Sequence, residues 1–391
     1  MSFSRPWLVF EPQTGGHRGD YVRWLLAGLR RNGRPIRIRF VLAHGILQED
    51  GGLAPEIAAA PHGVEFVEIP EETDRKQWPA LLKKAIADAV PERLLLFELT
   101  PWENWLSCHR LGVPISGILF VQYPELDWSC GSWSRRVGRW LRFRVKEWKT
   151  ARWLKRQDWR SVFLFNGERA CEYLNRRFGH TPVFRPIPDP APLEGVAAGG
   201  PASLSVPRVR SEEGVRFLFP GTLSRRKGAE VLLKALGRVS SETAKRSVYI
   251  LAGQAEARDR KALENRVARL RRRRPDIRLE WDDRFLPEAE LQDRIRQSDW
   301  ILAPYVRTEY SSGIFARAAS AGTPILGPAD GLLGRLIREW GLGRSAETTP
   351  AAWAKALESA VGSPMTMDES KRLAFLRRSR AEDFARQLLG G

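Results

Sequence analysis

The chain contains 391 residues, with 64 Lys and Arg against 46 Asp and Glu, so its formal net charge is +18. Hydrophobic residues make up 43% and charged residues 28%, proportions that exclude a collagen-like, coiled-coil or wholly disordered chain. The three cysteines include no C-x-x-C pair, which argues against a disulfide framework or a cysteine zinc site and favours a reducing compartment.

No apolar run approaches the roughly 20 residues that a membrane-spanning helix needs. The first twelve residues lack the basic-then-apolar plan of a signal peptide. We therefore expect a cytoplasmic protein, either in solution or peripheral at the inner face of the membrane. The positive excess suits an anionic membrane, a nucleic acid or a phosphorylated small molecule, and composition does not choose among them.

In the first half of the chain, short apolar runs alternate with amphipathic segments, which predicts a parallel sheet with helices on both faces. The expected strands are residues 7–12, 37–44, 64–70, 93–99, 115–121 and 161–167, with helices that include 21–31 and 78–89. After Pro190 a stretch rich in Pro, Gly, Ala and Ser predicts a linker over 191–210. Residues 1–190 are thus expected to form a first domain.

The second half restarts the same alternation, so we expect a second doubly wound domain over residues 211–367. Its expected strands are 215–221, 247–253, 277–281, 300–305 and 324–328. An amphipathic helix is expected over 368–389. Ligands of such sheets bind beyond the carboxyl ends of the strands.

The segment FLFPGTLSRRKGAEVLLKAL, residues 217–236, places basic side chains at a strand carboxyl end. A buried strand ends at Gly221, and Thr222 follows it. The turn then carries Arg225, Arg226 and Lys227 before a helix whose N-terminal NH groups favour an anion. This position predicts a phosphate site; the alternative is a loop of solvated charges.

The segment EYSSGIFARAASAGTPILGP, residues 309–328, leads through small residues into another helix. Glu309 is suited to accept hydrogen bonds from sugar hydroxyls. The following loop, Tyr310, Ser311, Ser312 and Gly313, leaves NH groups open to a ligand. The alternative is a plain helix cap by one of the serines.

Together the two segments resemble retaining glycosyltransferases of the GT-B fold, glycosyltransferase family 4 in particular. In that family a strand ends in G-R-x-x-x-x-K-G, and a later loop carries E-x7-E followed by a G-x-P turn. The similarity covers roughly residues 215–340, including LAGQ at 251–254 and the segment 284–305. The N-terminal half is similar only in plan.

The resemblance implies two Rossmann-like domains facing across a cleft and a nucleotide diphosphate sugar as co-substrate. A hexosyl group would be transferred with retention and without a metal or other cofactor. Lys227, with Arg225 or Arg226, would bind the diphosphate, and Glu309 would orient the sugar. A lipid-linked or polysaccharide-precursor acceptor would bind residues 1–190, and the C-terminal helix, 368–391, would cross back to the first domain.

The chain departs from the family pattern at two donor-site positions. Thr222 stands where the family has arginine, and Arg317 stands where the second glutamate of E-x7-E holds the nucleotide ribose. Reversed charge at Arg317 does not preserve a carboxylate–diol contact. Two alternatives therefore stay open: a noncatalytic GT-B-fold scaffold, and a glycosyltransferase acting on a nucleic acid such as tRNA.

In the first domain, TGGHRGDY at 14–21 follows the first expected strand. Gly15 and Gly16 allow close backbone approach to a ligand, and His17 and Arg18 would reach phosphate or acceptor. The alternative is a tight strand-to-helix connection.

The segment 133–160 carries eleven Lys and Arg against two acidic residues, a net charge of +9. Apolar side chains share one helical face, while arginines and a lysine lie off it: Trp133, Val137, Trp140, Leu141, Val145 and Trp148 against Arg135, Arg139, Arg142 and Lys146. This pattern is typical of a helix at an anionic membrane interface. The alternative is a helix that buries this stripe in the core.

A second basic run, residues 258–274, has nine Lys and Arg against Asp259 and Glu264. Favourable charge at a helix C-terminus accounts for it. A nucleic-acid footprint is the alternative.

Overall fold

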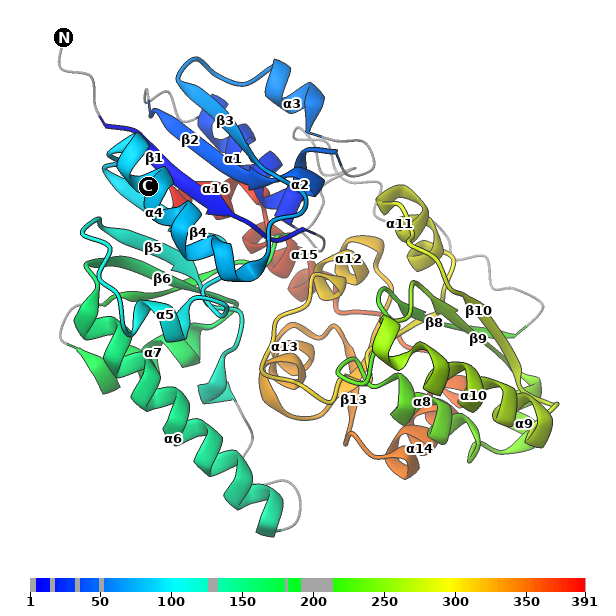
Figure 1. The fold of residues 1–391 in the computed structure, drawn as a ribbon. Coiled ribbons are helices and arrows are strands. Elements are labelled where there is room, and N and C mark those ends of the chain that lie inside the picture. Colours follow the sequence, from blue (N-terminus) through cyan, green and yellow to red (C-terminus); the bar gives the residue numbers. More distant parts are fainter. Residues whose placement is uncertain are drawn as a thin grey trace. The chain divides into compact units, whose positions relative to one another are not determined.

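The computed structural model describes residues 5–14, 18–31, 36–48, 53–125, 133–179, 182–190 and 214–390. The chain divides into two compact units, shown in Figure 1. Unit 1 comprises Met1–Pro188 together with Ala381–Gly391, and unit 2 comprises Asp189–Arg380.

Unit 1 is built on a seven-stranded parallel sheet of order β3-β2-β1-β4-β5-β6-β7. Its strands are β1 (Trp7–Glu11), β2 (Ile38–Ala43), β3 (Val64–Ile69), β4 (Arg93–Leu96), β5 (Ile115–Ile118), β6 (Trp159–Phe165) and β7 (Phe184–Ile187). Strands β1 and β5 are buried along their whole length, and β4 is buried except at its first residue, because helices cover both faces of a parallel sheet.

The helices of unit 1 connect these strands. They are α1 (Arg18–Arg31), α2 (His44–Gln48), α3 (Ala54–Ala58), α4 (Trp78–Ala89), α5 (Glu103–Leu106), α6 (Trp133–Arg156), α7 (Glu168–Phe178) and α16 (Ala381–Leu388), with 3-10 turns η1 (Arg75–Gln77) and η2 (Tyr123–Glu125).

Helix α16 completes the core on one face of the unit 1 sheet. Phe384 is fully buried, and its ring centroid lies 5.4 Å from that of Tyr21 on α1. A Cβ added to Gly28 of α1 would lie 2.4 Å from the Cβ of Ala385, so glycine is required for α1 and α16 to approach this closely. The last residues of the chain are therefore part of the hydrophobic core of unit 1.

Unit 2 is built on a six-stranded parallel sheet of order β10-β9-β8-β11-β12-β13. Its strands are β8 (Val215–Pro220), β9 (Ser247–Ala252), β10 (Arg278–Asp282), β11 (Trp300–Leu302), β12 (Ile325–Pro328) and β13 (Gly343–Ala346). Its helices are α8 (Ala229–Leu236), α9 (Ser241–Lys245), α10 (Ala257–Arg273), α11 (Glu288–Arg296), α12 (Ile314–Ala321), α13 (Gly331–Trp340), α14 (Pro350–Gly362) and α15 (Glu369–Arg378). Two apolar clusters cover the two faces of the sheet.

The expected α/β class with two doubly wound parallel sheets is confirmed. The single helix expected over 368–389 is wrong: the segment forms α15 in unit 2 and α16 in unit 1, separated at Ser379 and Arg380. Strands β7 and β13 were not expected from the sequence. The linker expected over 191–210 lies outside the described residues. Among the residues that the structure describes, no helix is both long and apolar enough to cross a bilayer.

Candidate active site at the strand carboxyl ends

The strand order of unit 2 reverses between β8 and β11. Strands β8, β9 and β10 lie on one side of this point, and β11, β12 and β13 lie on the other. The connections that follow β8 and β11 therefore leave the sheet in opposite directions and open a crevice. The two sequence motifs, residues 217–236 and 309–328, supply these two loops. Their residues therefore meet at the place where a doubly wound sheet binds ligands.

The loop after β8 has its backbone fixed on both sides. The NH of Leu223 donates to the carbonyl of Gln254 at 2.9 Å, and the NH of Val306 donates to the carbonyl of Arg226 at 3.0 Å. Gly228 has φ +81°, and a Cβ there would lie 1.8 Å from the carbonyl oxygen of Pro304. The N-terminus of α8 is thus held against the end of β11.

Lys227 lies over the carboxyl end of β8. A Cβ built on Gly221 would lie 3.0 Å from the Lys227 Nζ, and this ammonium lies 6.0 Å from the ring centroid of Tyr305. The Tyr305 hydroxyl is 3.1 Å from the Ser312 Oγ. Lys227, from the loop after β8, and Ser312, from the loop after β11, therefore contact the same tyrosine.

A second contact between the two loops is made by Tyr310. The guanidinium carbons of Arg226 and Arg307 lie 5.5 Å and 5.4 Å from its ring centroid, within cation–π range. Arg307 also donates from Nε to the carboxylate of Glu309, which is buried. The crevice therefore combines two arginines and a lysine with one buried carboxylate.

Two other predicted site residues are held by acidic partners. Ser311 donates to the Asp189 carboxylate at 2.6 Å. Arg317 is buried within α12, and its guanidinium binds Glu288 at the start of α11, with Nε–Oε1 and Nη2–Oε2 distances of 2.8 Å. Arg317 thus forms a bidentate ion pair inside its own unit. Gly313 is the N-cap residue of α12.

Thr222 and Arg225 lie on the outside of the loop after β8. Thr222 is exposed, and the side chain of Arg225 is 79% exposed. The backbone NH of Arg225 donates to the Asp259 carboxylate at 2.9 Å. Arg226 and Lys227 are less exposed than Arg225, so they are the better placed cations of this turn.

Unit 1 has its own reversal of strand order, between β1 and β4, and a charged cluster lies there. Glu11 ends β1 and is buried, and Arg18 at the start of α1 lies 3.4 Å from it and also pairs with Glu98 beyond β4. Burial raises the pKa of Glu11 to about 7, although Arg18 acts to lower it. Of the predicted residues here, Gly15, Gly16 and His17 lie outside the described residues.

Glu11, Glu98 and Arg307 were not among the site residues expected from the sequence. Glu11 ends an apolar strand, which is the available signal, because a carboxylate there lies at the ligand-binding edge. Glu98, which follows β4, lies in the same cluster as Glu11 only because β4 is the neighbour of β1 in the sheet.

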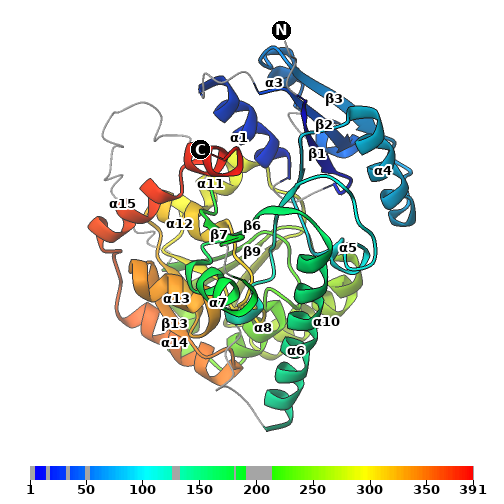
Figure 2. The same ribbon diagram turned by 90° about the vertical axis from the view of Figure 1, so that its left-hand side faces the viewer.

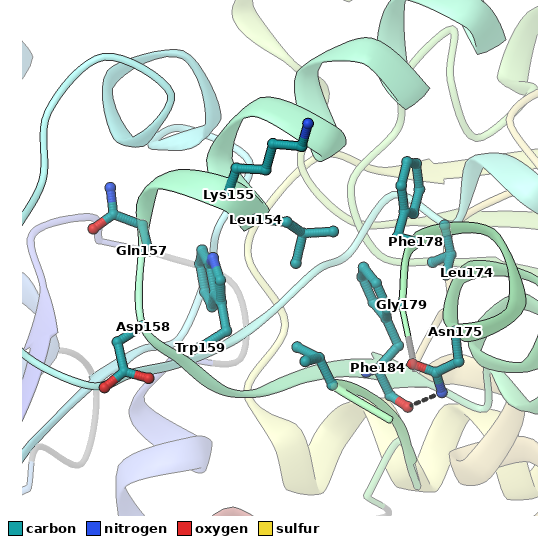
Figure 3. Close-up of a pocket in the computed structure, with 11 residues that line it drawn as sticks. Leu154, Lys155, Gln157, Asp158, Trp159, Leu174, Asn175, Phe178, Gly179 and Phe184 are labelled. Atoms are coloured by element: carbon teal, nitrogen blue, oxygen red, sulfur yellow. Dashed lines mark hydrogen bonds between the residues drawn. The ribbon is translucent and has the colours of Figure 1, made fainter. Parts of the chain in front are cut away.

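Unit 1 also has a pocket of about 420 Å³, and Figure 3 shows the residues that line it. Trp159 and Phe184, the first residues of β6 and β7, line it, so it lies at the amino ends of these strands. The Asn175 side chain in its wall already exchanges two hydrogen bonds with the Phe184 backbone. The pocket is therefore not part of the ligand-binding edge.

The second basic run forms α10 and its C-terminus. Arg266 pairs with Glu230 at 2.8 Å, Arg271 donates to the Leu279 carbonyl, and Arg274 pairs with Asp276 at 2.8 Å. These contacts stay within unit 2 and support the structural explanation of the run. No group of three or more His, Cys, Asp or Glu side chains suited to a metal ion occurs among the described residues.

No family model matches the sequence, and no curated protein matches it in sequence. Solved structures match over nearly the whole chain. HepE (Alr3699) from Anabaena, solved with UDP, has 13% identity and a TM-score of 0.60, covering 98% of each chain. Sucrose-phosphate synthase from Thermosynechococcus elongatus has 16% identity and a TM-score of 0.68, covering 98% of this chain and 97% of that one.

WaaG, a glycosyltransferase involved in lipopolysaccharide biosynthesis, has 14% identity and a TM-score of 0.59, covering 99% of this chain and 100% of that one. These neighbours are GT-B glycosyltransferases. The fold of this chain is the GT-B fold. At such low identity the likeness shows the fold alone.

Proposed function

We propose that the protein is a retaining, family 4-like glycosyltransferase that moves a hexosyl group from a nucleotide diphosphate sugar to an acceptor without a metal ion. The observation that carries this proposal is the meeting of Lys227, Arg226 and Glu309 at the strand-order reversal of unit 2. Cations and helix N-termini there suit a diphosphate, and a carboxylate beside them suits sugar hydroxyls.

In this proposal Lys227 and Arg226 bind the diphosphate and stabilise the charge that develops as it departs. Glu309, oriented by Arg307, holds the sugar. The bond from the anomeric carbon to the diphosphate breaks, and the bond to the acceptor oxygen forms on the same face. The acceptor's proton passes to the departing diphosphate oxygen. The backbone NH groups of 310–313 bind the donor.

The donor to test first is UDP-glucose. HepE, which shares the fold, has been solved with UDP and with UDP-glucose. The acceptor is proposed to be a lipid-linked or polysaccharide-precursor glycan bound at the Glu11–Arg18–Glu98 cluster of unit 1. Carboxylates there would accept hydrogen bonds from its hydroxyls. That WaaG acts in lipopolysaccharide biosynthesis is consistent with this acceptor class.

One observation favours a second candidate, a noncatalytic GT-B protein. Arg317 occupies the position from which a carboxylate would hold ribose, and Glu288 engages its guanidinium. A protein that had lost ribose recognition would keep the fold and this ion pair. It would bind no nucleotide diphosphate.

The test is a thermal-shift series with UDP, GDP, ADP and dTDP on the wild type and Lys227→Ala. A ligand at 100 times its dissociation constant stabilises by about 2.7 kcal/mol. Removing Lys227 should lower the affinity for the preferred nucleotide about 10- to 100-fold, because charge-assisted contacts contribute about 1.5–3 kcal/mol. Lys245→Ala is the matched control, since Lys245 is exposed and precedes the amino end of β9 in the same unit.

The nucleotide sugar identified in this way is then incubated with glycan acceptors, and the anomeric configuration of the product is determined by NMR. If Lys227→Ala and Lys245→Ala lowered the nucleotide affinity equally, Lys227 would not be the residue that binds the diphosphate. Absence of binding by all four nucleotides to folded wild type would favour the noncatalytic candidate.

A further inference from the structure

Helix α6 carries a strip of exposed apolar side chains. Trp140, Leu141, Val145 and Trp148 are 54%, 52%, 52% and 57% exposed. They are half of the eight large hydrophobic residues that are exposed among the described residues. At 3.6 residues per turn the four cover about 140° of the helix circumference. Single exposed apolar residues are ordinary, but a contiguous strip on one helix marks an interaction surface.

The strip is not needed to pack α6 onto unit 1. The opposite face of the helix does this with Phe143, Thr150 and Trp153, of which the last two are buried. Glu147 on that face accepts from the Tyr173 hydroxyl at 2.7 Å and pairs with Arg177 at 3.0 Å. The alternative that Trp140, Leu141, Val145 and Trp148 form the core stripe is therefore wrong.

Basic side chains border the strip. Arg142, Arg152, Lys155 and Arg156 are exposed, and the guanidinium carbon of Arg152 lies 4.7 Å from the ring centroid of Trp148. Over the whole of α6 ten Lys and Arg stand against one acidic residue, Glu147, which is buried. The surface that α6 presents is thus both apolar and strongly cationic.

The strip occupies the middle of α6, with seven helical residues before Trp140 and eight after Trp148. In a parallel sheet a connecting helix starts at the carboxyl edge and runs back to the amino edge. Helix α6 is 24 residues long, about 36 Å at 1.5 Å per residue, so it is much longer than the four-residue β5. Figures 1 and 2 both show its N-terminal half extending beyond the other elements of unit 1.

We propose that α6 docks unit 1 onto an anionic bilayer surface, with Trp140, Leu141, Val145 and Trp148 inserted at the interface and the bordering Lys and Arg on lipid phosphates. An interfacial helix needs an apolar strip flanked by cations, and tryptophan favours the headgroup region. The proposal goes beyond sugar transfer and stands without it.

Two other occupants fit the strip less well. A nucleic acid would use the arginines, and tryptophans stack on bases, but Leu141 and Val145 offer no stacking surface. Helix α10 is also basic, with eight Lys and Arg against Asp259 and Glu264, but none of the exposed large hydrophobic residues in the described part of the chain lies on it. A second copy of α6 would bring two helices of like charge together, which costs free energy.

The test is co-sedimentation of the full chain with phosphatidylcholine vesicles, alone or with about one third phosphatidylglycerol, an anionic content that attracts basic helices. We expect binding to the anionic vesicles only. Trp140→Ala/Trp148→Ala should weaken it at least about tenfold, and Arg152→Gln/Arg156→Gln should weaken it and reduce its salt dependence. Unchanged thermal unfolding would show that both variants fold.

Two control variants match these changes outside α6. Phe285→Ala removes an aromatic side chain that is 66% exposed, and Arg269→Gln/Arg272→Gln removes two exposed charges from α10. Both should bind vesicles as the wild type does. The proposal is overturned if wild type ignores anionic vesicles, if the α10 variant loses as much binding as the α6 variants, or if the tryptophan variant only abolishes self-association or RNA binding.

Discussion

Gly228 is the residue through which the loop after β8 fits against the end of β11. Its φ of +81° is strained for any residue with a side chain, and a Cβ would lie 1.8 Å from the Pro304 carbonyl oxygen. Gly228→Ala is expected to lower the free energy of unfolding by at least about 2 kcal/mol, because backbone strain adds to the displacement of the loop.

Nucleotide affinity should fall in the Gly228→Ala variant as well, since Lys227 precedes the glycine. Chemical denaturation and nucleotide titration check both effects. Gly362→Ala is the control: its Cβ would meet nothing within 4 Å, at the end of α14. Equal stability of the two variants would contradict the packing argument.

Glu11 makes the free energy of unfolding of unit 1 depend on pH. Burial raises its pKa from 4.5 to about 7, so the folded state binds a proton more tightly than the unfolded state. Its contribution to stability is complete below about pH 4.5 and is lost as the pH rises through 7. This shift of the Glu11 pKa corresponds to about 3 kcal/mol of unfolding free energy. Glu11→Gln does not titrate and should therefore gain about 3 kcal/mol relative to wild type between pH 4 and pH 8.

Urea denaturation of wild type and Glu11→Gln at the two pH values measures this gain. Glu172→Gln, which changes an exposed carboxylate of α7, should show no such trend. A stability difference between Glu11→Gln and wild type that stays constant with pH would contradict the burial of Glu11 as a titrating group.

At the scale of elements, α11 and α12 are joined by the ion pair of Glu288 and Arg317. Arg317→Glu would place two carboxylates together and is expected to cost about 2–4 kcal/mol, somewhat less than for a fully buried pair because the Glu288 side chain is 40% exposed. The exchanged variant Arg317→Glu/Glu288→Arg should recover more than about 1 kcal/mol of this.

A double-mutant cycle of unfolding free energies measures this recovery. The exposed pair Glu172 and Arg176 on α7, 3.6 Å apart, serves as the control, with an expected coupling below about 0.5 kcal/mol. A coupling free energy no larger than that of the control pair would mean that the packing of α11 against α12 does not depend on the ion pair of Glu288 and Arg317. Nucleotide titration of the exchanged variant shows in addition whether a carboxylate at 317 improves ribose binding.

The sequence predicted those elements whose apolar pattern is strong. Helix α4 was expected with the bounds that the structure has, and eleven strands were located. Strand β13, Gly343–Ala346, was missed because its only apolar side chain is Ala346. Strand β7 was missed because it contains Pro186, which is tolerated at a sheet edge such as this one.

The sequence pattern does not say what lies against an apolar face. Residues of α15 and α16 continue one amphipathic pattern across Ser379 and Arg380, so the break between the two units was not visible. The same limit applies to α6, where core and outer stripes have the same period. Lys227 and Arg226 were found because each follows a strand in a basic motif, whereas Glu98 depends on the order of strands in space.

At the scale of the molecule, unit 1 is discontinuous in sequence and unit 2 is continuous. Unit 1 needs residues 381–390 for its core, where Phe384 and Leu388 are buried. Phe384→Ala is expected to lower the stability of unit 1 by about 3–5 kcal/mol, because it leaves a cavity among Tyr21 and its aromatic neighbours. Unit 2 should keep its stability, since it contributes no residue to that cluster.

Scanning calorimetry separates the two units if each responds to its own perturbation. Phe384→Ala should lower one transition, and the preferred nucleotide diphosphate should raise the other, because Lys227 and Glu309 lie in unit 2. Phe285→Ala, an exposed change in unit 2, should move neither transition. A chain ending at Arg380 should keep the nucleotide-responsive transition and lose the other one. If the two transitions moved together in every variant, the units would not be independent folding blocks.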